Sequence, residues 1–232
     1  IYGLHAGTEA LRNPKREIIR VLATENALRR LGEGASLPMQ PKIVGPREID
    51  RLLPPDAVHQ GLLVEARPLV PPMLDELAAE GIVLALDQIT DPHNVGAILR
   101  SAAAFAVKVV ILPQRHSPSA TGVLAKAASG ALEHVPLLPV RNLAEALTAL
   151  GERGFLRVGL DSAGEVTLDE ARLRSPLVLA LGAEGKGLRE RVRSCCDLVL
   201  RIDLPGTIKS LNVSNAAAIA LSIAHRRLAP TG

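Results

Sequence analysis

Strand-like apolar runs alternate with helical patterns from residue 78 to the end of the chain, and this alternation limits the possible folds more than any other feature. The runs occupy residues 82–87, 108–112, 135–138, 155–160, 177–181 and 198–203. Strands separated by helices pair in parallel and are buried on both faces of their sheet. The sequence therefore predicts an α/β domain that is built on a parallel sheet.

A smaller α/β unit precedes this domain. Its strand-like runs lie at 17–23 and 61–66. Its short helical patterns lie at 8–12, 26–31 and 47–52. Proline density then peaks between Arg67 and Pro72, and proline restricts itself and its predecessor to extended conformations. We therefore divide the chain into an N-terminal domain 1–67, a proline-rich linker 68–77 and a C-terminal domain 78–232.

The composition narrows the function classes. The apolar fraction of 47% is ample for a folded core, and no apolar run approaches the roughly 18 residues of a membrane-spanning helix. The cations are mostly arginine, 21 of 27, which suits a phosphate-bearing partner without requiring one. The aromatic residues are Tyr2, Phe105 and Phe155, so we do not expect a platform of stacked bases.

The two cysteines, Cys195 and Cys196, are adjacent in the sequence. Neighbouring cysteines rarely meet disulfide geometry, and these two lack the spacing of metal ligands. No signal peptide is recognisable in the sequence. These observations predict a reduced, cytoplasmic protein without a metal site or a membrane segment.

Three polar turns, each between a predicted strand and a predicted helix, are the candidate ligand-binding segments. They are residues 91–96 followed by Arg100, residues 182–187, and residues 210–215. Open α/β sheets bind ligands at the carboxyl ends of their strands, where helix N-termini offer free backbone N–H groups. Each turn alone has a simpler explanation, because Ser and Asn suit helix caps and Arg100 suits a solvated surface. Their repetition favours one shared ligand site.

The glycine-rich turn differs from the common nucleotide-binding loops. Its order is G-x-x-G-x-G, whereas the dinucleotide fingerprint is G-x-G-x-x-G and a Walker loop requires Gly-Lys-Ser/Thr. Glu184 within this turn would repel a phosphate but suits a ligand with positive charge or hydroxyl donors. The sequence offers no catalytic cysteine, Ser–His–Asp set or metal cluster. The combination favours group transfer from a bound small molecule over a nucleotide-dependent oxidoreductase.

The last helical pattern, which runs to about Leu228, carries an alanine-rich stripe. The stripe consists of Val213, Ala217, Ala220, Leu221, Ala224 and Leu228, which share one helix face. Small side chains allow a close partner, which is either another helix of the chain or the same helix of a second subunit.

The three turns, in this order, resemble the signature motifs of the SpoU (TrmH-type) RNA ribose 2′-O-methyltransferases. The matching segments are 91–96 with Arg100 and Ser101, 182–185 with Gly187, and 210–214. The N-terminal unit, from Tyr2 to about Gly61, resembles the L30e-like substrate-binding domain of one branch of that family. That branch includes the bacterial enzymes that methylate a guanosine of 23S rRNA.

The resemblance implies a SPOUT fold, in which a parallel-sheet α/β domain ends in a deep C-terminal trefoil knot. It implies S-adenosylmethionine (AdoMet) as cofactor. The residues expected to hold AdoMet, largely through backbone groups, are Gly182, Ala183, Ile202, Leu204 and Leu211. The family works as a homodimer with its sites near the subunit interface.

The resemblance also implies a set of catalytic residues. They are Asn94, Arg100, Glu184, Ser210 and Asn212. Arg100 is expected to activate the ribose hydroxyl, and we favour binding of the adjacent phosphate and stabilisation of the alkoxide over a literal base role, because a guanidinium rarely gives up its proton. Two alternatives stay open, namely a tRNA ribose as the substrate and a catalytically silent RNA-binding or assembly protein.

Overall fold

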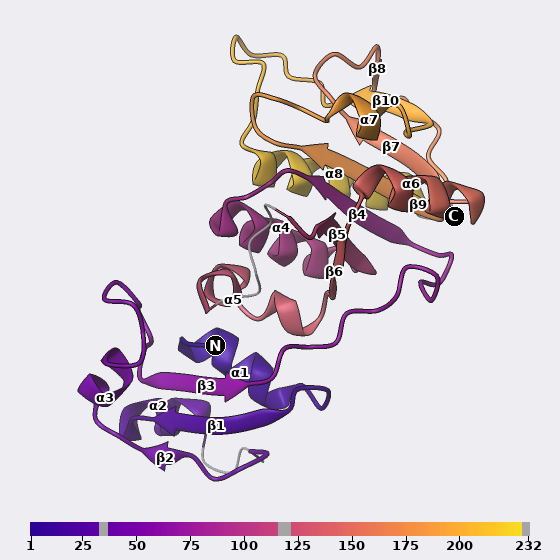
Figure 1. Cartoon of the computed structure of the whole chain (residues 1–232). Coiled ribbons are helices and arrows are strands. Elements are labelled where there is room, and N and C mark those ends of the chain that lie inside the picture. The colour runs from indigo at the N-terminus through magenta and orange to yellow at the C-terminus, as the bar shows by residue number, and fades with distance from the viewer. Residues whose placement is uncertain (33–36, 116–121, 229–232) are drawn as a thin grey trace.

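The structure is a computed structural model that describes residues 1–32, 37–115 and 122–228 and contains two sheets (Figure 1). The smaller sheet has the order β2-β1-β3, with β1 parallel to β2 and antiparallel to β3. The N-terminal elements are α1 (Leu4–Arg12), β1 (Ile18–Ala23), α2 (Glu25–Leu31), β2 (Lys42–Ile43), α3 (Pro46–Asp50) and β3 (Leu62–Ala66). The strands and helices predicted for this part are confirmed. The sequence missed β2, which is two exposed residues long and carries no apolar alternation.

The larger sheet has seven strands in the order β6-β5-β4-β9-β7-β10-β8, and every pairing is parallel. Its strands are β4 (Ile82–Asp87), β5 (Val109–Pro113), β6 (Leu137–Val140), β7 (Leu156–Leu160), β8 (Val166–Thr167), β9 (Leu177–Gly182) and β10 (Leu198–Arg201). The predicted parallel sheet is therefore confirmed. The two-residue β8 was missed, and the run predicted at 135–138 begins two residues later as β6.

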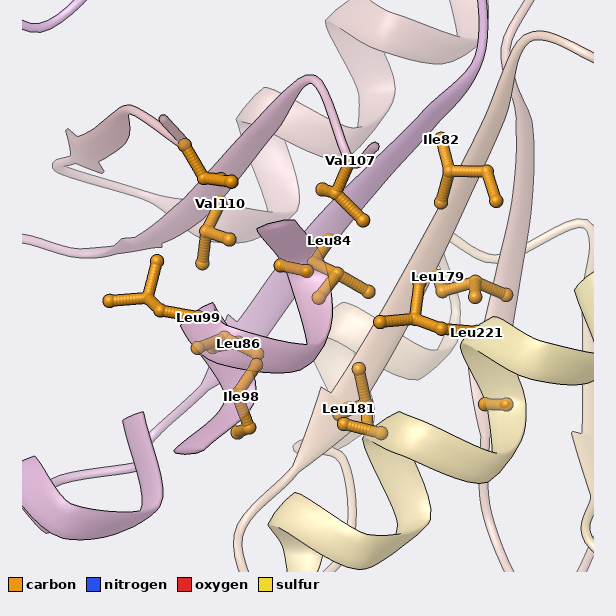
Figure 2. Packing of buried hydrophobic residues seen from close by; sticks show 14 of the residues in the cluster. Ile82, Leu84, Leu86, Ile98, Leu99, Val107, Val110, Leu179, Leu181 and Leu221 are labelled. Carbon is orange, nitrogen blue, oxygen red and sulfur yellow. The ribbon is translucent and has the colours of Figure 1, made fainter. Parts of the chain in front are cut away.

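Helices cover both faces of the large sheet. They are α4 (Pro92–Ala104), α5 (Gly122–Ala128), the 3₁₀ turn η1 (Ala131–Glu133), α6 (Leu143–Glu152), α7 (Glu190–Arg193) and α8 (Val213–Leu228). Alternate residues of β4 serve the two faces: Leu84 and Leu86 join the core under α4, α5 and α8, whereas Val83 and Ala85 join the core under α6 and α7. Figure 2 shows the first core, where side chains of β4 and β9 meet Ile98 of α4 and Leu221 of α8. Burial on both faces explains why the strand sequences are nearly continuous apolar runs.

The alanine-rich stripe of α8 packs inside the same chain. Ala217, Ala220, Leu221 and Ala224 are fully buried, and α8 contacts α4 and β9. The stripe was expected to pack against another helix of the chain or against a second subunit, and in the structure it packs against α4 of the same chain. The stripe therefore supplies no argument for a second subunit.

Side chains join the N-terminal part to the larger sheet's domain. Helix α1 faces α5 and η1 across the junction (Figure 1). The Arg16 guanidinium contacts the Glu133 carboxylate at 2.6 Å, and the two side chains are only 8% and 4% exposed. Asn13 donates a further hydrogen bond of 2.8 Å to the same carboxylate. Glu133 thus fixes the orientation of the smaller sheet with a buried ion pair.

Candidate functional site

Three turns at the carboxyl ends of neighbouring strands bring the predicted polar residues together. The turn after β4 opens α4, the turn after β9 holds the glycines, and the segment after β10 opens α8. Because β4 and β9 are adjacent and β10 lies next to β7, which pairs with β9, these turns share one edge of the sheet. This is the placement that the parallel order predicts for a ligand site.

Asp91, and not Asn94, caps helix α4. The Asp91 carboxylate accepts the backbone N–H of His93 at 3.0 Å, and Pro92 occupies the first helical position. The side chain of Asn94 is therefore available for other contacts. A plain capping role for Asn94, which the sequence alone allowed, does not hold.

Asn212 links the three turns through its side chain. Its amide nitrogen donates to Asn94 Oδ1 at 3.0 Å and lies 3.5 Å from Glu184 Oε2. Its amide oxygen accepts from the backbone N–H of Ser214 at 2.9 Å and from the Ser214 hydroxyl at 2.6 Å. Asn212 thus caps α8 with one end of its amide and joins Asn94 to Glu184 with the other.

A cavity of about 370 Å³ lies beside this junction. Every residue predicted to hold the cofactor lines it, together with Glu184 and Ser210: Gly182, Ala183, Ile202, Leu204 and Leu211. Its apolar walls include Leu160, Leu181 and Val213. Backbone groups, apolar walls and carboxylates are therefore presented to one space.

The glycine turn can close only because Gly182 has no side chain. A Cβ at Gly182 would lie 2.0 Å from the carbonyl carbon of Gly187 and 2.4 Å from the amide nitrogen of Leu188. Both neighbours are backbone atoms, which cannot swing away as a flexible side chain would. The amide of Gly187 closes the turn by donating to Ala183 O at 2.9 Å. Residues 182–187 line the cavity, and the missing Cβ of Gly182 allows the main chain of this wall to pack so closely.

Gly96 serves packing instead of the ligand. A Cβ at Gly96 would lie 2.4 Å from the Ala127 side chain and 2.8 Å from the backbone nitrogen of Ala128. This motif glycine therefore allows α5 to cross α4 at close range, away from the polar junction.

The buried carboxylate of Asp87 anchors the segment after the glycine turn. Asp87 is the last residue of β4 and is 0% exposed. It accepts hydrogen bonds from the backbone N–H of Arg189 at 2.9 Å and from Arg189 Nε at 2.8 Å. Sequence reasoning assigned no role to Asp87. The available signal was a single charged residue that ends an otherwise apolar strand.

A fourth segment, after β7, also lines the cavity and was missed. Asp161 and Ser162 belong to it, and the Asp161 carboxylate lies 3.8 Å from Arg193. Asp161 follows a predicted strand end, which was the only sequence signal. The cavity thus has carboxylates at Asp161 and Glu184.

Arg100 lies in a different place. It is exposed on α4 and lines a second cavity, between α1 and the α5–η1 turn, that shares no residue with the first. Within one chain the structure therefore brings Asn94, Glu184 and Asn212 together, places Ser210 on the cavity wall, and leaves Arg100 outside that cavity.

The first cavity fits AdoMet. A close backbone wall and apolar side chains suit a purine ring, and the carboxylates of Asp161 and Glu184 suit a ligand with an ammonium group, a sulfonium and ribose hydroxyls. Among the described residues, no group of three or more His, Cys, Asp or Glu side chains could hold a metal ion. In the part of the chain that the structure describes, no helix is long and apolar enough to cross a membrane.

Comparisons with known proteins agree with this geometry. Residues 81–222 match the SpoU rRNA methylase family, and residues 1–72 match the RNA 2′-O ribose methyltransferase substrate-binding family. The chain is 37% identical to the 23S rRNA (guanosine-2′-O-)-methyltransferase RlmB of Pseudomonas aeruginosa, over 95% of this chain and 93% of that protein. It is 44% identical to RlmB of Shewanella oneidensis, over 73% and 71% of the two chains.

A solved structure has the same fold. The SpoU methyltransferase AviRb of Streptomyces viridochromogenes, crystallised with AdoMet, superposes with a TM-score of 0.82 at 22% identity, covering 98% of this chain and 89% of that one. The family model matches more than half of the chain, and the Pseudomonas aeruginosa relative is 37% identical over 93% of its own length. The chain belongs to the SpoU rRNA methylase family.

Proposed function

We propose that this protein transfers a methyl group from AdoMet to the 2′-hydroxyl of a guanosine ribose in 23S rRNA. The observation that carries the proposal is the Asn212 side chain, which joins the first and second motifs beside a cavity with a backbone wall. The rRNA substrate comes from the RlmB relatives, which are named for this reaction. The proposal includes a cytoplasmic location, which the bacterial rRNA-methylating relatives support.

The proposed binding mode uses the first cavity. Gly182, Ala183, Ile202, Leu204 and Leu211 hold the cofactor through backbone groups and apolar contacts. The cofactor supplies a methyl group that its sulfonium has already activated. The protein must then align the ribose oxygen with that methyl, and such alignment contributes roughly 7–11 kcal/mol when the reacting atoms are held in line.

The polar junction positions the ribose in this proposal. The hydrogen bond to Asn94 and the contacts with Ser214 hold the Asn212 amide in one orientation. Asn94 and Asn212 orient the sugar, Glu184 accepts from hydroxyl or amino donors, and Ser210 exchanges hydrogen bonds at the rim. Arg100 binds the phosphate that flanks the target and stabilises the forming alkoxide electrostatically.

The proposal includes a division of labour along the chain. Residues 1–67 form an L30e-like RNA-binding domain, 68–77 a linker and 78–232 the catalytic domain, and the substrate-binding match over residues 1–72 supports this division. In the proposal the catalytic domain ends in the deep C-terminal trefoil knot of a SPOUT fold. Its support is the close packing of the β7, β9 and β10 loops around one cavity. The protein works as a homodimer, in keeping with its family.

The test is transfer of labelled methyl from AdoMet to purified RNA. The intact chain is incubated with 23S rRNA and with total tRNA, and methylated riboses are mapped by their resistance to alkaline hydrolysis. We expect modification at one guanosine of 23S rRNA. Methylation of tRNA instead would favour the tRNA alternative. Tight AdoMet binding by calorimetry without any transfer would identify a catalytically silent RNA-binding protein and overturn the proposal.

A further inference from the structure

The carboxylate of Asp87 is a charge that lies fully inside the protein. Its side chain is 0% exposed, at the end of a strand that is otherwise apolar. A buried charge is unfavourable unless hydrogen bonds and an opposite charge compensate for the lost water. Arg189 supplies both: its backbone N–H donates to Asp87 Oδ2 at 2.9 Å, its Nε donates to Oδ1 at 2.8 Å, and a terminal nitrogen lies 2.6 Å from Oδ1. Both oxygens of Asp87 are therefore bonded to one residue.

Asp87 holds the glycine turn at both of its ends. The main chain of Asp87 is paired with Gly182, where β9 ends and the turn begins. The side chain of Asp87 holds Arg189, which follows the turn and precedes helix α7. Residues 183–188 therefore form a loop whose first and last anchors are the same residue of the neighbouring strand.

This loop has more conformational freedom than the strands beside it. Two backbone hydrogen bonds close it internally, from the amides of Lys186 and Gly187 to Ala183 O at 3.2 and 2.9 Å. Gly185 and Gly187 have φ angles of 73° and 65°, in the region that glycine adopts at little cost. Residues 182–187 all line the first cavity. An anchor outside the loop therefore limits the shapes that this wall of the cavity can take.

The same residue begins the turn that carries Asn94. The chain leaves β4 at Asp87 and enters α4 at Pro92. Asn94 on this helix and Glu184 in the glycine turn lie 3.0 and 3.5 Å from the amide nitrogen of Asn212. One of these turns continues the main chain of Asp87 and the other is bonded to its side chain. Asp87 therefore fixes the position of one turn relative to the other.

A second carboxylate–arginine pair has the same geometry at the opposite edge of the sheet. The Asp197 carboxylate accepts the backbone N–H of Arg157 at 2.8 Å, its Nε at 3.1 Å and its terminal nitrogen at 2.6 Å. Asp197 precedes β10 and Arg157 lies near the start of β7, so the pair is at the amino ends of the strands. Neither residue lines the first cavity. The chain thus contains a comparable pair that anchors no cofactor loop.

We propose that Asp87 is a positioning residue for the cofactor and that it acts through Arg189. The carboxylate keeps the glycine turn in its binding conformation before AdoMet arrives, so binding does not carry the full cost of ordering the loop. The inference rests on the proposed function for the place of AdoMet in the first cavity. It assigns a role in cofactor affinity to two residues that lie outside the three motif segments.

The test measures AdoMet affinity by calorimetry and amide hydrogen exchange in the cofactor-free protein. Asp87→Asn keeps the size of the side chain and an acceptor for the Arg189 N–H, but it removes the charge that holds the guanidinium. We expect the Kd of AdoMet to rise about tenfold, because the loop must then be ordered on binding. The amides of Lys186 and Gly187 should exchange faster. At saturating AdoMet the loop is ordered again, so kcat should stay within about twofold of the wild type.

Arg189→Gln tests the same contact from its half-exposed side, since the Arg189 side chain is 48% exposed. It should raise the Kd of AdoMet by a similar factor. The double variant Asp87→Asn with Arg189→Gln should bind no more weakly than Asp87→Asn alone, because both changes remove one interaction. Losses of affinity that multiply in the double variant would mean that Asp87 does not act through Arg189.

Asp197→Asn is the matched control for an effect on folding alone. It should lower the melting temperature without changing the Kd of AdoMet or the exchange of the turn amides. If Asp87→Asn is folded and has the wild-type Kd and exchange rates, Asp87 only supports the fold, and the inference is wrong although the proposed function stands. If Asp87→Asn does not fold, Arg189→Gln decides, and a wild-type Kd in that variant overturns the inference. If the wild type binds AdoMet but methylates no RNA, the proposed function fails, whereas the role of Asp87 in cofactor binding is still measured by the Kd.

Discussion

The two cavities of this protein are built by different means. Main-chain turns and apolar side chains at one edge of the large sheet form most of the first, and the hydrogen bonds of Asn212 with Asn94 and Ser214 lie beside it. Ionisable side chains on helices of both parts of the chain form the second. The first cavity therefore depends on local backbone geometry, and the second on how the two parts are held together.

This difference matches the two ligands in the proposal. A cofactor is the same molecule in every reaction cycle, and a wall of backbone atoms, which no side-chain motion can alter, suits it. An RNA strand is long and anionic, and charged groups spread over a domain junction suit it. Substitutions at the glycine turn of the first cavity and at the junction between the two parts of the chain test this difference separately.

The largest effect is expected from Gly182→Ala. The added methyl group would meet the backbone of Gly187 at 2.0 Å, so the turn and the paired strand end must move. We expect a loss of about 3 kcal/mol in the free energy of unfolding and no measurable AdoMet binding. Urea unfolding and calorimetry check both. Gly206→Ala is the matched control, because nothing lies within 4 Å of its Cβ position, and it should change neither quantity. Normal AdoMet binding by Gly182→Ala would contradict the backbone wall.

The substitution Glu133→Gln should weaken the contact between the N-terminal part and the large-sheet domain. This change removes one charge of an ion pair whose side chains are 8% and 4% exposed, and leaves Arg16 buried without its partner. We expect about 3 kcal/mol of destabilisation, weaker RNA binding and unchanged AdoMet affinity. Thermal unfolding and the two binding assays measure these quantities.

Glu65→Gln provides the comparison for that variant. Its partner is Arg20, and these side chains are 48% and 50% exposed. An exposed pair contributes little, so the change should cost about 0.5 kcal/mol or less. If Glu133→Gln and Glu65→Gln lower the free energy of unfolding equally, burial does not explain the contribution of the Glu133–Arg16 pair.

The sequence predicted the first cavity because its parts are local. Each motif is contiguous, and strands that end in polar turns must meet at one edge of a parallel sheet. Gly182, Ile202 and Leu211, which the family resemblance implied as cofactor-binding residues, line one cavity in the structure. The parallel sheet was predictable for the same reason, since alternation of strand and helix needs no distant contact.

The second cavity and the supporting contacts could not be predicted in this way. Of the residues that line the second cavity, His134 lies 125 positions after Glu9 in the sequence, and neither residue belongs to a recognisable pattern. The Asp87–Arg189 contact joins residues that are 102 positions apart, and it depends on how the end of β4 sits against the segment after β9. Arg100 was identified by the resemblance of its motif to the family's, which does not say which neighbouring element its side chain faces.

Asn212→Asp separates the capping role of this side chain from its role at the junction. Aspartate keeps an acceptor for the Ser214 N–H, so α8 should begin as before. It loses the N–H donor to Asn94 and places a second negative charge near Glu184. We expect methyl transfer to fall about 100-fold with an unchanged melting temperature. Asn212→Ala should lose activity and about 1 kcal/mol of stability as well. Full activity in the aspartate variant would reduce Asn212 to a helix cap.

The last prediction concerns Cys196, a partly buried thiol that packs against strand β7. Burial raises the pKa of this thiol from 9.0 to about 12, and its sulfur lies 3.0 Å from the Cβ position of Gly159 on β7. Below pH 9 the thiol is protonated in both states, so it does not affect stability. Between pH 9 and 12 the unfolded chain loses the proton while the folded chain keeps it, so unfolding becomes more favourable. At pH 10 we expect about 1 kcal/mol less stability than at pH 8 from this group. Cys196→Ala should remove that part of the pH dependence, which is measured as the free energy of urea unfolding at several pH values. If the free energy of unfolding falls equally with pH in the variant and the wild type, burial against the sheet does not keep the thiol neutral.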